Sequence, residues 1–364
     1  MPPPTTLDDL RRHAVARTLF APTTLIAAVR RLGFVQADPL RAPARAQDLT
    51  LRHRVRDYVA GDLERSYPRL ALEEDFFVNY GFLPRATAAL MHPRTPPGVW
   101  SAERERQAAA VLAFVHERGV VHPREVDAHF DHGSVVNWFG GNSRASTELL
   151  DALHYRGRLR TARREGGTRL YALRAPAVAA ADSDAALDTL IDVVVAAYAP
   201  LPAPSLGRLA SLLCGGVPQW KAQRAAALAR AHARLPGAEV DGQRWVWPAG
   251  EDPRSRRHVA AADDTTLRLL APFDPIVWDR RRFEHLWGWA YRFEAYTPAA
   301  RRERGHYALP LLWRGRVIGW ANLAVVDGRL MPQLGHVQGK PRDAAYRAAL
   351  DDELHRLHGF LGLR

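Results

Sequence analysis

Apolar residues recur every three or four positions along much of this chain, which is the spacing of one buried face of an α-helix. Near the middle of the sequence this pattern predicts three helices, followed by a hairpin of two short strands around Gly166-Gly167. The helices are predicted over residues 103–119, 122–130 and 143–157. Three short helices and a hairpin are typical of a winged helix, in which the third helix is the recognition helix and the hairpin is the wing.

The same order of elements returns between residues 185 and 250, although the two segments share little residue identity. Residues 7–90 contain a longer version of it, whereas the chain beyond residue 263 alternates short apolar runs with turns. We therefore predict an α+β fold of about three tandem winged-helix modules, a small C-terminal antiparallel β-barrel and a terminal helix. The predicted domains are 1–98, 99–176, 183–258 and 263–364.

The charge of the chain narrows the classes of partner. The 364 residues carry a formal net charge of +12, and almost every positive charge is an arginine, since Lys221 and Lys340 are the only lysines. A protein this basic is attracted to polyanions, and to nucleic acid first. The alternative is that the arginine content follows the composition of the genome and that these side chains solvate helix faces.

Other classes are excluded by cysteine content, hydropathy and missing motifs. The single cysteine, Cys214, excludes a disulfide framework and a thiolate zinc site within one chain, and it suits a reducing cytoplasm. No apolar run approaches the length of about 18 residues that a membrane span needs. The histidines lack cysteine partners or metal-binding spacing, and no glycine-rich phosphate loop occurs, so we expect neither a metal nor an organic cofactor.

A Gln-x-Asp triplet in the first module is the most specific signal. Gln36, Ala37 and Asp38 lie within LGFVQADPLRAPARAQDL (32–49), just ahead of a run of arginines. This stretch resembles the core motif of the YcaQ/AlkZ family of winged-helix DNA glycosylases. The segment 269–323, which begins LLAPFDPIVWDRRRF, resembles the barrel segment of the same family. The resemblance implies that the chain excises damaged bases from DNA, with Gln36 and Asp38 as catalytic residues.

The chemistry of base excision explains these residue types. Cleavage of an N-glycosidic bond passes through an oxocarbenium-like sugar, so Asp38 would stabilise the positive charge and act as general base while Gln36 orients a water. A purine alkylated at N7 is already cationic and leaves without a general acid. The first module has no lysine for a Schiff-base lyase step, so a monofunctional glycosylase is expected. The alternative is that both residues only stabilise a turn before Pro39.

Candidate DNA contacts are basic residues near the triplet, around the wing and in the C-terminal segment. Arg41 and Arg45 are four residues apart and would reach phosphates beside the site. Of the others, the arginines around the wing would contact the backbone rather than bases, and the basic turn in the C-terminal segment would enter a groove at the lesion. These others are Arg144, Arg163, Arg164, Arg169, Arg301, Arg302, Arg304 and His306. The alternative for each group is that its side chains are solvated or ion-paired on the protein surface. The hairpin WRGR (313–316) is an alternative DNA contact to the C-terminal group. The tryptophans interpreted as core aromatics are Trp278, Trp287 and Trp289.

The predicted partner is double-stranded DNA carrying alkylated bases, bound by a monomer in the bacterial cytoplasm, at the nucleoid, without membrane contact. The resemblance implies that interstrand crosslinks are further substrates. A competing hypothesis is a non-enzymatic winged-helix transcriptional regulator, which explains the charge and the order of elements equally well. It does not explain a Gln-x-Asp triplet outside any recognition helix, or the appended C-terminal segment. A structural RNA-binding protein is a third hypothesis.

Overall fold

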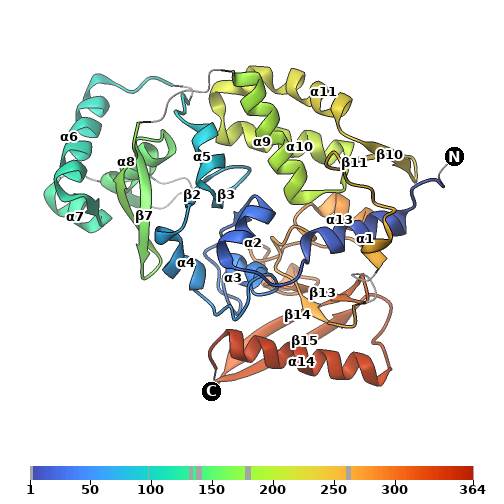
Figure 1. The fold of residues 1–364 in the computed structure, drawn as a ribbon. Coiled ribbons are helices and arrows are strands. Elements are labelled where there is room, and N and C mark those ends of the chain that lie inside the picture. The colour runs from blue at the N-terminus through green and yellow to red at the C-terminus, as the bar shows by residue number, and fades with distance from the viewer. Residues whose placement is uncertain are drawn as a thin grey trace. The chain divides into compact units, whose positions relative to one another are not determined.

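The computed structural model describes residues 3–96, 98–130, 134–136, 142–176, 182–259 and 264–363, with the backbone alone described at 134–136 and 142–144. The chain folds into two compact units (Figure 1). Unit 1 comprises Met1–Leu63, Ile191–Leu209 and Leu228–Arg364, and unit 2 comprises Glu64–Leu190 and Ala210–Ala227. Because each unit joins separate stretches of sequence, residues far apart in the chain meet within one unit. None of the helices among the described residues has the length and apolar character that crossing a membrane requires.

The N-terminal part of unit 1 consists of short helices around a two-residue strand. Their bounds are α1 (Leu7–Thr18), α2 (Leu25–Leu32), β1 (Val35–Gln36) and α3 (Ala46–Leu51). Helix α1 begins with a capping box, in which the Thr6 hydroxyl accepts from the Asp9 backbone N–H and the Asp9 carboxylate accepts from that of Thr6. Helix α2 ends at Gly33, whose φ of +73° favours glycine. This stop turns the chain into β1, which carries Gln36.

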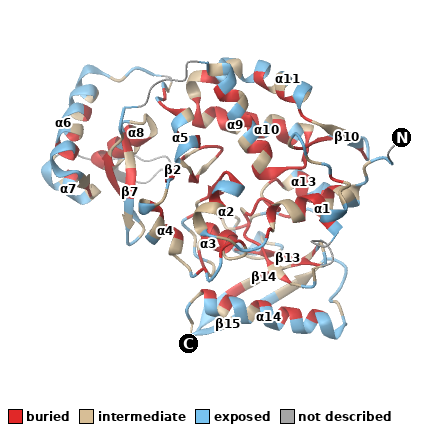
Figure 2. Cartoon of the chain, in the orientation of Figure 1, coloured by how far each residue is buried: buried red, intermediate tan, exposed pale blue. Residues whose placement is uncertain are grey.

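The C-terminal part of unit 1 contains an antiparallel sheet in the order β12-β13-β14-β15. The strands are β12 (Arg268–Leu269), β13 (Leu309–Trp313), β14 (Arg316–Val326) and β15 (Arg329–His336). Every second residue of β14 from Val317 to Leu323 is buried, as in a strand with one face on the core (Figure 2). The sheet is open, with β12 and β15 at its edges, so the prediction of a β-barrel is wrong. Local turn signals predict hairpins, but closure depends on pairing between distant edge strands.

The predicted terminal helix is confirmed. Helix α14 (Ala344–Phe360) packs against β15, where the Tyr346 hydroxyl and His336 Nε2 are hydrogen-bonded at 2.8 Å. The Tyr346 ring also meets the ring of Trp313 on β13, with 6.0 Å between the centroids. Helix α13 (Arg280–Trp287) precedes β13 in the chain and buries Phe283 and Leu286. The C-terminal sheet is therefore joined to helices by aromatic contacts, which bury much of its apolar surface.

A second sheet of unit 1 has the order β10-β11-β9, so its first strand pairs with its third. The strands are β9 (Leu201–Pro202), β10 (Gly237–Val240) and β11 (Gln243–Val246). The helices in this part of the chain are α9 (Ser183–Tyr198), α10 (Ala203–Gly216) and α11 (Arg224–Arg234). The hairpin turns at Asp241-Gly242, where both residues have positive φ. The hairpin that the repeated order of elements predicts at the end of this segment is confirmed.

Unit 2 begins with a hairpin and continues with helices and further antiparallel strand pairs. Its first elements are α4 (Asp62–Ser66, which starts in unit 1), β2 (Leu72–Phe76), β3 (Tyr80–Pro84) and α5 (Arg85–Met91). They are followed by α6 (Ala102–Arg118), β4 (Val120–Val121), α7 (Pro123–His129), β5 (Ser134–Val136), β6 (Asn142–Arg144), α8 (Ala145–Tyr155), β7 (Leu159–Glu165) and β8 (Thr168–Leu173). The sheet order β4-β8-β7 again pairs the first strand with the third. The helices and hairpin that the periodicity predicts here are confirmed.

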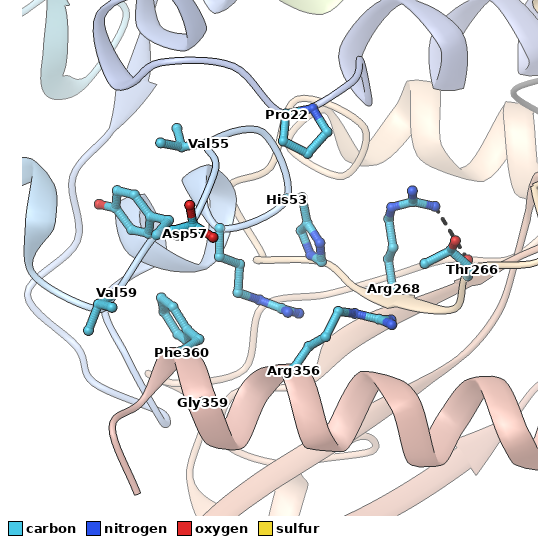
Figure 3. A pocket seen from close by; sticks show the side chains of 12 residues that line it. Pro22, His53, Val55, Asp57, Val59, Thr266, Arg268, Arg356, Gly359 and Phe360 are labelled. Carbon is cyan, nitrogen blue, oxygen red and sulfur yellow. Dashed lines mark hydrogen bonds between the residues drawn. The ribbon is translucent and has the colours of Figure 1, made fainter.

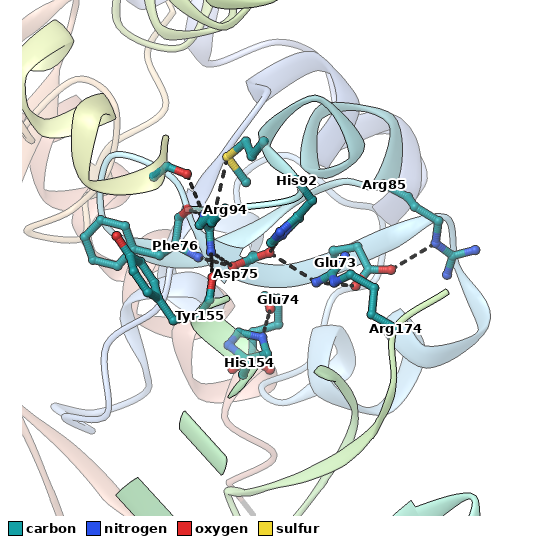
Figure 4. A network of polar contacts seen from close by, with 12 residues as sticks. Glu73, Glu74, Asp75, Phe76, Arg85, His92, Arg94, His154, Tyr155 and Arg174 are labelled. Atoms are coloured by element: carbon teal, nitrogen blue, oxygen red, sulfur yellow. Dashed lines mark hydrogen bonds and ion pairs between the residues drawn. The ribbon is translucent and has the colours of Figure 1, made fainter. Parts of the chain in front are cut away.

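Unit 2 contains a buried polar network around Asp75 on β2 (Figure 4). The fully buried Asp75 carboxylate accepts from Arg94 Nη1 at 2.8 Å and lies 2.7 Å from His92 Nε2. Burial alone would raise the pKa of Asp75, but the charge of Arg94 and the hydrogen bond with His92 outweigh it and hold that pKa far below its ordinary value. The network therefore ties β2 to the chain that follows α5 through a carboxylate that stays ionised.

A buried ion pair joins the two ends of unit 1. Arg54 and Asp274 are 0% exposed, and the guanidinium donates to both carboxylate oxygens at 2.8 and 3.0 Å. Arg54 also donates to the backbone carbonyls of Thr18 and Thr50. The Asp274 carbonyl in turn accepts from the backbone N–H of Trp278 at 2.8 Å. The pair thus connects the loop 272–279 to α1 and α3.

Replacing Asp274 with alanine is expected to lower the free energy of unfolding by about 3–5 kcal/mol, because it leaves the Arg54 charge buried and unpaired. The measurement is a urea titration followed by tryptophan fluorescence. Glu303→Ala is the control, since Glu303 pairs with Arg304 at 2.9 Å but its side chain is 65% exposed. That variant should lose less than about 1 kcal/mol. Equal losses in both variants would contradict a stabilising role for the buried pair.

Candidate active site

The Gln-x-Asp triplet lies in unit 1, where the chain leaves α2. Gln36 ends β1, and Asp38 precedes Pro39, which favours an extended conformation for Asp38. Side chains two residues apart in an extended chain point to the same side. The two residues are 7% and 8% exposed. The amide and the carboxylate therefore come from two positions close in the chain that are almost but not fully buried.

Hydrogen bonds fix the backbone around Asp38 and leave one carboxylate oxygen available. The Asp38 backbone N–H donates to Gln47 Oε1 at 3.2 Å, and Asp38 Oδ1 accepts from the backbone N–H of Leu40 at 2.9 Å. The second bond closes a turn across Pro39, so the turn expected as the alternative role is present. In the part of the chain that the structure describes, no hydrogen bond reaches Asp38 Oδ2. The turn thus occupies one oxygen, and the other is left to bind a water or substrate atom.

The surroundings of Asp38 favour a carboxylate of reduced acidity. Burial raises the pKa of Asp38, and the bond from the Leu40 N–H only partly offsets this. Tyr307, which is 2% exposed, lies close enough to Asp38 to feel its charge. Burial raises the pKa of the Tyr307 hydroxyl most, and the charge of Asp38 raises it next. Its hydroxyl has no hydrogen-bond partner among the described residues. Such a carboxylate is costly to ionise in the free protein. A cationic neighbour, such as an oxocarbenium, therefore strongly stabilises its ionised form.

Gln36 is held by a residue 242 positions further along the chain. Trp278 Nε1 donates to Gln36 Oε1 at 2.7 Å. The half-buried Trp278 ring lies 5.1 Å from the ring of Tyr198 on α9, and the exposed Arg208 guanidinium of α10 lies 5.9 Å from the Trp278 centroid. The sequence interpretation of Trp278 as a core aromatic missed this contact. The only available signal was its position in the C-terminal segment that resembles the glycosylase family.

Comparison with known proteins connects this site to a family. A family model described as DNA glycosylase AlkZ-like matches residues 29–360, which include the triplet and Trp278. The chain belongs to the AlkZ-like DNA glycosylase family. Its fold is similar to that of the DNA glycosylase AlkZ of Streptomyces sahachiroi, with a TM-score of 0.62 and 16% identity over 99% of this chain and 98% of that one. The family predicted from the two resembling stretches is confirmed.

Near the triplet of this AlkZ-like chain, the two predicted DNA contacts have different surroundings. Arg41 is exposed and has no ion pair among the described residues. Arg45 is half-buried and stands at the N-cap of α3, which begins at Ala46. The residues between them are irregular rather than helical, so the spacing of four does not place both on one helix face. Arg41 therefore remains the better candidate for a phosphate contact beside the site.

The arginines predicted as phosphate contacts around the wing are largely engaged inside unit 2. Arg164 binds the buried Glu74 carboxylate, and its Nε lies 3.0 Å from both oxygens of Glu74. Arg169 pairs with Asp151 at 2.8 Å, whereas Arg163 pairs with its exposed neighbour Glu165. Arg144 ends β6, and its side chain lies outside the described residues. These ion pairs disfavour Arg164 and Arg169 as phosphate contacts, because their charges are already neutralised.

The basic residues of the C-terminal segment divide in the same way. Arg301 and His306 are exposed and have no hydrogen bond or ion pair through their side chains among the described residues. Arg302 donates to the Thr297 carbonyl at 2.8 Å. The guanidinium of Arg304 lies 5.4 Å from the ring centroids of both Trp289 and Trp320, a packing role that competes with DNA contact. Arg301 and His306 therefore remain available to a polyanion.

One cavity of unit 1 is lined by residues other than the triplet. It encloses about 660 Å³ and includes Arg52, His53, Arg268 and Arg356, but neither Gln36 nor Asp38 (Figure 3). Its charges are largely paired, since Arg52 and Arg356 both bind the buried Glu353 and Arg268 binds Asp264. Burial and the neighbouring arginines hold the pKa of His53 well below its ordinary value. Within the described residues, no group of three or more His, Cys, Asp or Glu side chains is arranged to hold a metal ion.

Proposed function

We propose that this protein is a monofunctional DNA glycosylase that releases N7-alkylated, cationic purines by hydrolysis, with Gln36 and Asp38 as catalytic residues. The observation that carries the proposal is the almost buried Asp38 carboxylate, whose Oδ2 has no hydrogen-bond partner among the described residues. Membership of the AlkZ-like DNA glycosylase family supports the reaction class. Interstrand crosslinks that involve N7 of guanine are a further candidate substrate.

The proposed mechanism divides the work between the two side chains. As the bond between C1′ and the base nitrogen lengthens, positive charge develops on the sugar and is stabilised by the Asp38 carboxylate. Asp38 Oδ2 then accepts a proton from the water that attacks C1′, and the Gln36 amide orients that water. The bonding electrons leave with the base, which becomes neutral. No lysine precedes Lys221, so the first module has no lysine side chain for a Schiff-base lyase step.

We further propose that residues 99–176 and 183–258 form winged helices that contribute to binding duplex DNA. The support is the order of the strands, since β4-β8-β7 and β9-β11-β10 each place the third strand between the first and the second. The division of the whole chain into 1–98, 99–176, 183–258 and 263–364 stays a prediction, as do the monomeric state and the location at the nucleoid.

The test of the proposed function is incubation of the protein with a duplex that contains a single N7-methylguanine, followed by mass detection of the free base. Release of the base, with the strand left unbroken until an abasic site is cleaved by alkali, is the expected result. Tight duplex binding without release of any base would favour the transcriptional regulator. Strand breakage without alkali would contradict the monofunctional assignment.

Replacing Arg41 with alanine is expected to weaken duplex binding and to lower the slope of log Kd against log salt by about one unit, because one phosphate contact is lost. Arg85→Ala is the matched control, since Arg85 is an exposed arginine that pairs with Glu73 at 3.1 Å and is not among the predicted DNA contacts. The measurement is a fluorescence-anisotropy titration at several salt concentrations. An unchanged slope in Arg41→Ala would show that this residue does not contact the backbone.

A further inference from the structure

The contact between Trp278 and Gln36 has a defined polarity. An indole N–H can only donate, so the atom that it meets at 2.7 Å must be the oxygen of the Gln36 amide and not its nitrogen. The orientation of this amide therefore follows from chemistry. Its NH₂ group is left with two donors, and none of the described residues accepts a hydrogen bond from it.

Trp278 is itself fixed on both sides. Its backbone N–H donates to the Asp274 carbonyl at 2.8 Å, and the Asp274 carboxylate is locked by Arg54. On the other side, Asp279 caps α13 by accepting from the Arg282 backbone N–H at 3.0 Å. The ring rests against the buried Tyr198. An indole held in this way can impose its geometry on Gln36, rather than adapt to it.

The polarity matters because Gln36 and Asp38 must hold one water from two directions. Asp38 Oδ2 can only accept from that water when ionised, so the water is best fixed if Gln36 donates to it. One lone pair of the water then receives the Gln36 N–H, one proton faces Asp38, and the other lone pair is free to attack C1′. A reversed amide would present a second acceptor and lose this arrangement.

We propose that Trp278 is a positioning residue for base excision, which orients the Gln36 amide so that its NH₂ group faces the nucleophilic water. This inference rests on the proposed glycosylase function. Trp278→Phe keeps an aromatic ring and removes the N–H, so single-turnover release of N7-methylguanine should slow by about tenfold, the loss that corresponds to one hydrogen bond of about 1.4 kcal/mol. Duplex affinity should stay within about twofold of wild type, because Trp278 acts through Gln36 rather than through DNA.

Trp287→Phe is the matched control. Trp287 is half-buried at the end of α13, and its indole N–H has no hydrogen-bond partner among the described residues. The substitution removes the same atoms from the same unit without removing a contact to Gln36. Its rate of base release should equal that of wild type. A similar slowing in both variants would attribute the effect to altered packing and overturn the proposal.

A double-variant cycle separates positioning from general damage. If Trp278 acts through Gln36, then Gln36→Ala and Gln36→Ala/Trp278→Phe should release base at the same rate, whereas independent roles would multiply the two losses. A double variant that is about tenfold slower than Gln36→Ala would overturn the proposal, as would a Trp278→Phe variant with the wild-type rate. If wild type itself releases no base, the proposed function fails instead.

A second readout does not depend on activity. The indole ¹H–¹⁵N resonance of Trp278, assigned by its absence from Trp278→Phe, should shift upfield in Gln36→Ala and exchange faster with solvent. The resonance of Trp287 should stay in place in the same spectrum. An unchanged Trp278 resonance in Gln36→Ala would show that the hydrogen bond is absent and would overturn the proposal, whatever the activity of the protein.

Discussion

Asp38→Asn is expected to slow the release of N7-methylguanine by about 10²–10³-fold, the usual cost of removing a preorganised electrostatic group from an active site. Asparagine keeps the shape of the side chain, and its oxygen can still accept from the Leu40 N–H that closes the turn. What is lost is the negative charge beside the developing oxocarbenium and the base that takes the proton from water. Single-turnover kinetics measures the rate, and anisotropy should show nearly unchanged duplex affinity.

Asp252→Asn is the control for this substitution. Asp252 closes the same kind of turn, since its Oδ1 accepts from the backbone N–H of Arg254 two residues later at 3.0 Å, but its side chain is half-exposed. This variant should keep the wild-type rate and melting temperature. An excision rate of Asp38→Asn within about threefold of the wild-type rate would contradict a catalytic role for Asp38, because the loss of a charge at the reacting centre slows the reaction by much more than that.

The same carboxylate determines the acid side of the pH profile. Burial raises the pKa of Asp38, so protonation begins at a higher pH than for an ordinary aspartate. The catalytic form is the ionised one, and the wild-type rate should therefore fall as the pH drops through this raised value. Asp38→Asn has no such group, and its residual rate should lack that limb of the profile.

The second large effect that we expect is a strong dependence of the excision rate on the charge of the leaving base. N7-methylguanine and N3-methyladenine are cationic and should be released, whereas hypoxanthine and uracil should be excised about 10²–10⁴-fold more slowly, because a neutral base needs a positioned general acid to leave. Gln36 and Asp38 do not supply that acid. The Tyr307 hydroxyl near Asp38 is buried, and burial and the Asp38 charge raise its pKa, so it is a poor proton donor to a departing base.

The comparison uses duplexes that differ only in the lesion, assayed at one pH and one salt concentration with mass detection of the free base. A duplex with an undamaged guanine at the same position is the control for background depurination. Comparable excision of hypoxanthine and N7-methylguanine would contradict the mechanism and would show that a general acid reaches the site. Wild-type release of the cationic bases alone would support hydrolysis driven by the charge of the leaving group.

Much of the local structure could be predicted from the sequence. Apolar periodicity predicted the helices α6 and α8 within a few residues, and the Gly166-Gly167 pair predicted the hairpin β7-β8. These features depend on backbone preferences and on one buried face, and both are determined by residues that are close together in the sequence. The triplet could be found for a similar reason, since Gln36 and Asp38 are two residues apart and precede a proline that extends the chain.

Only the tertiary structure decided which distant side chains meet. Trp278 contacts Gln36 across 242 positions, and Arg54 meets Asp274 across 220, because unit 1 joins both ends of the chain. The barrel prediction was wrong for the same reason, since the pairing of edge strands is not a local property. Net charge indicated a polyanion partner but could not tell an available cation such as Arg41 from Arg164, which is bound to Glu74. Ion pairing depends on which atoms folding brings together. The net charge of a sequence does not distinguish a paired arginine from an available one.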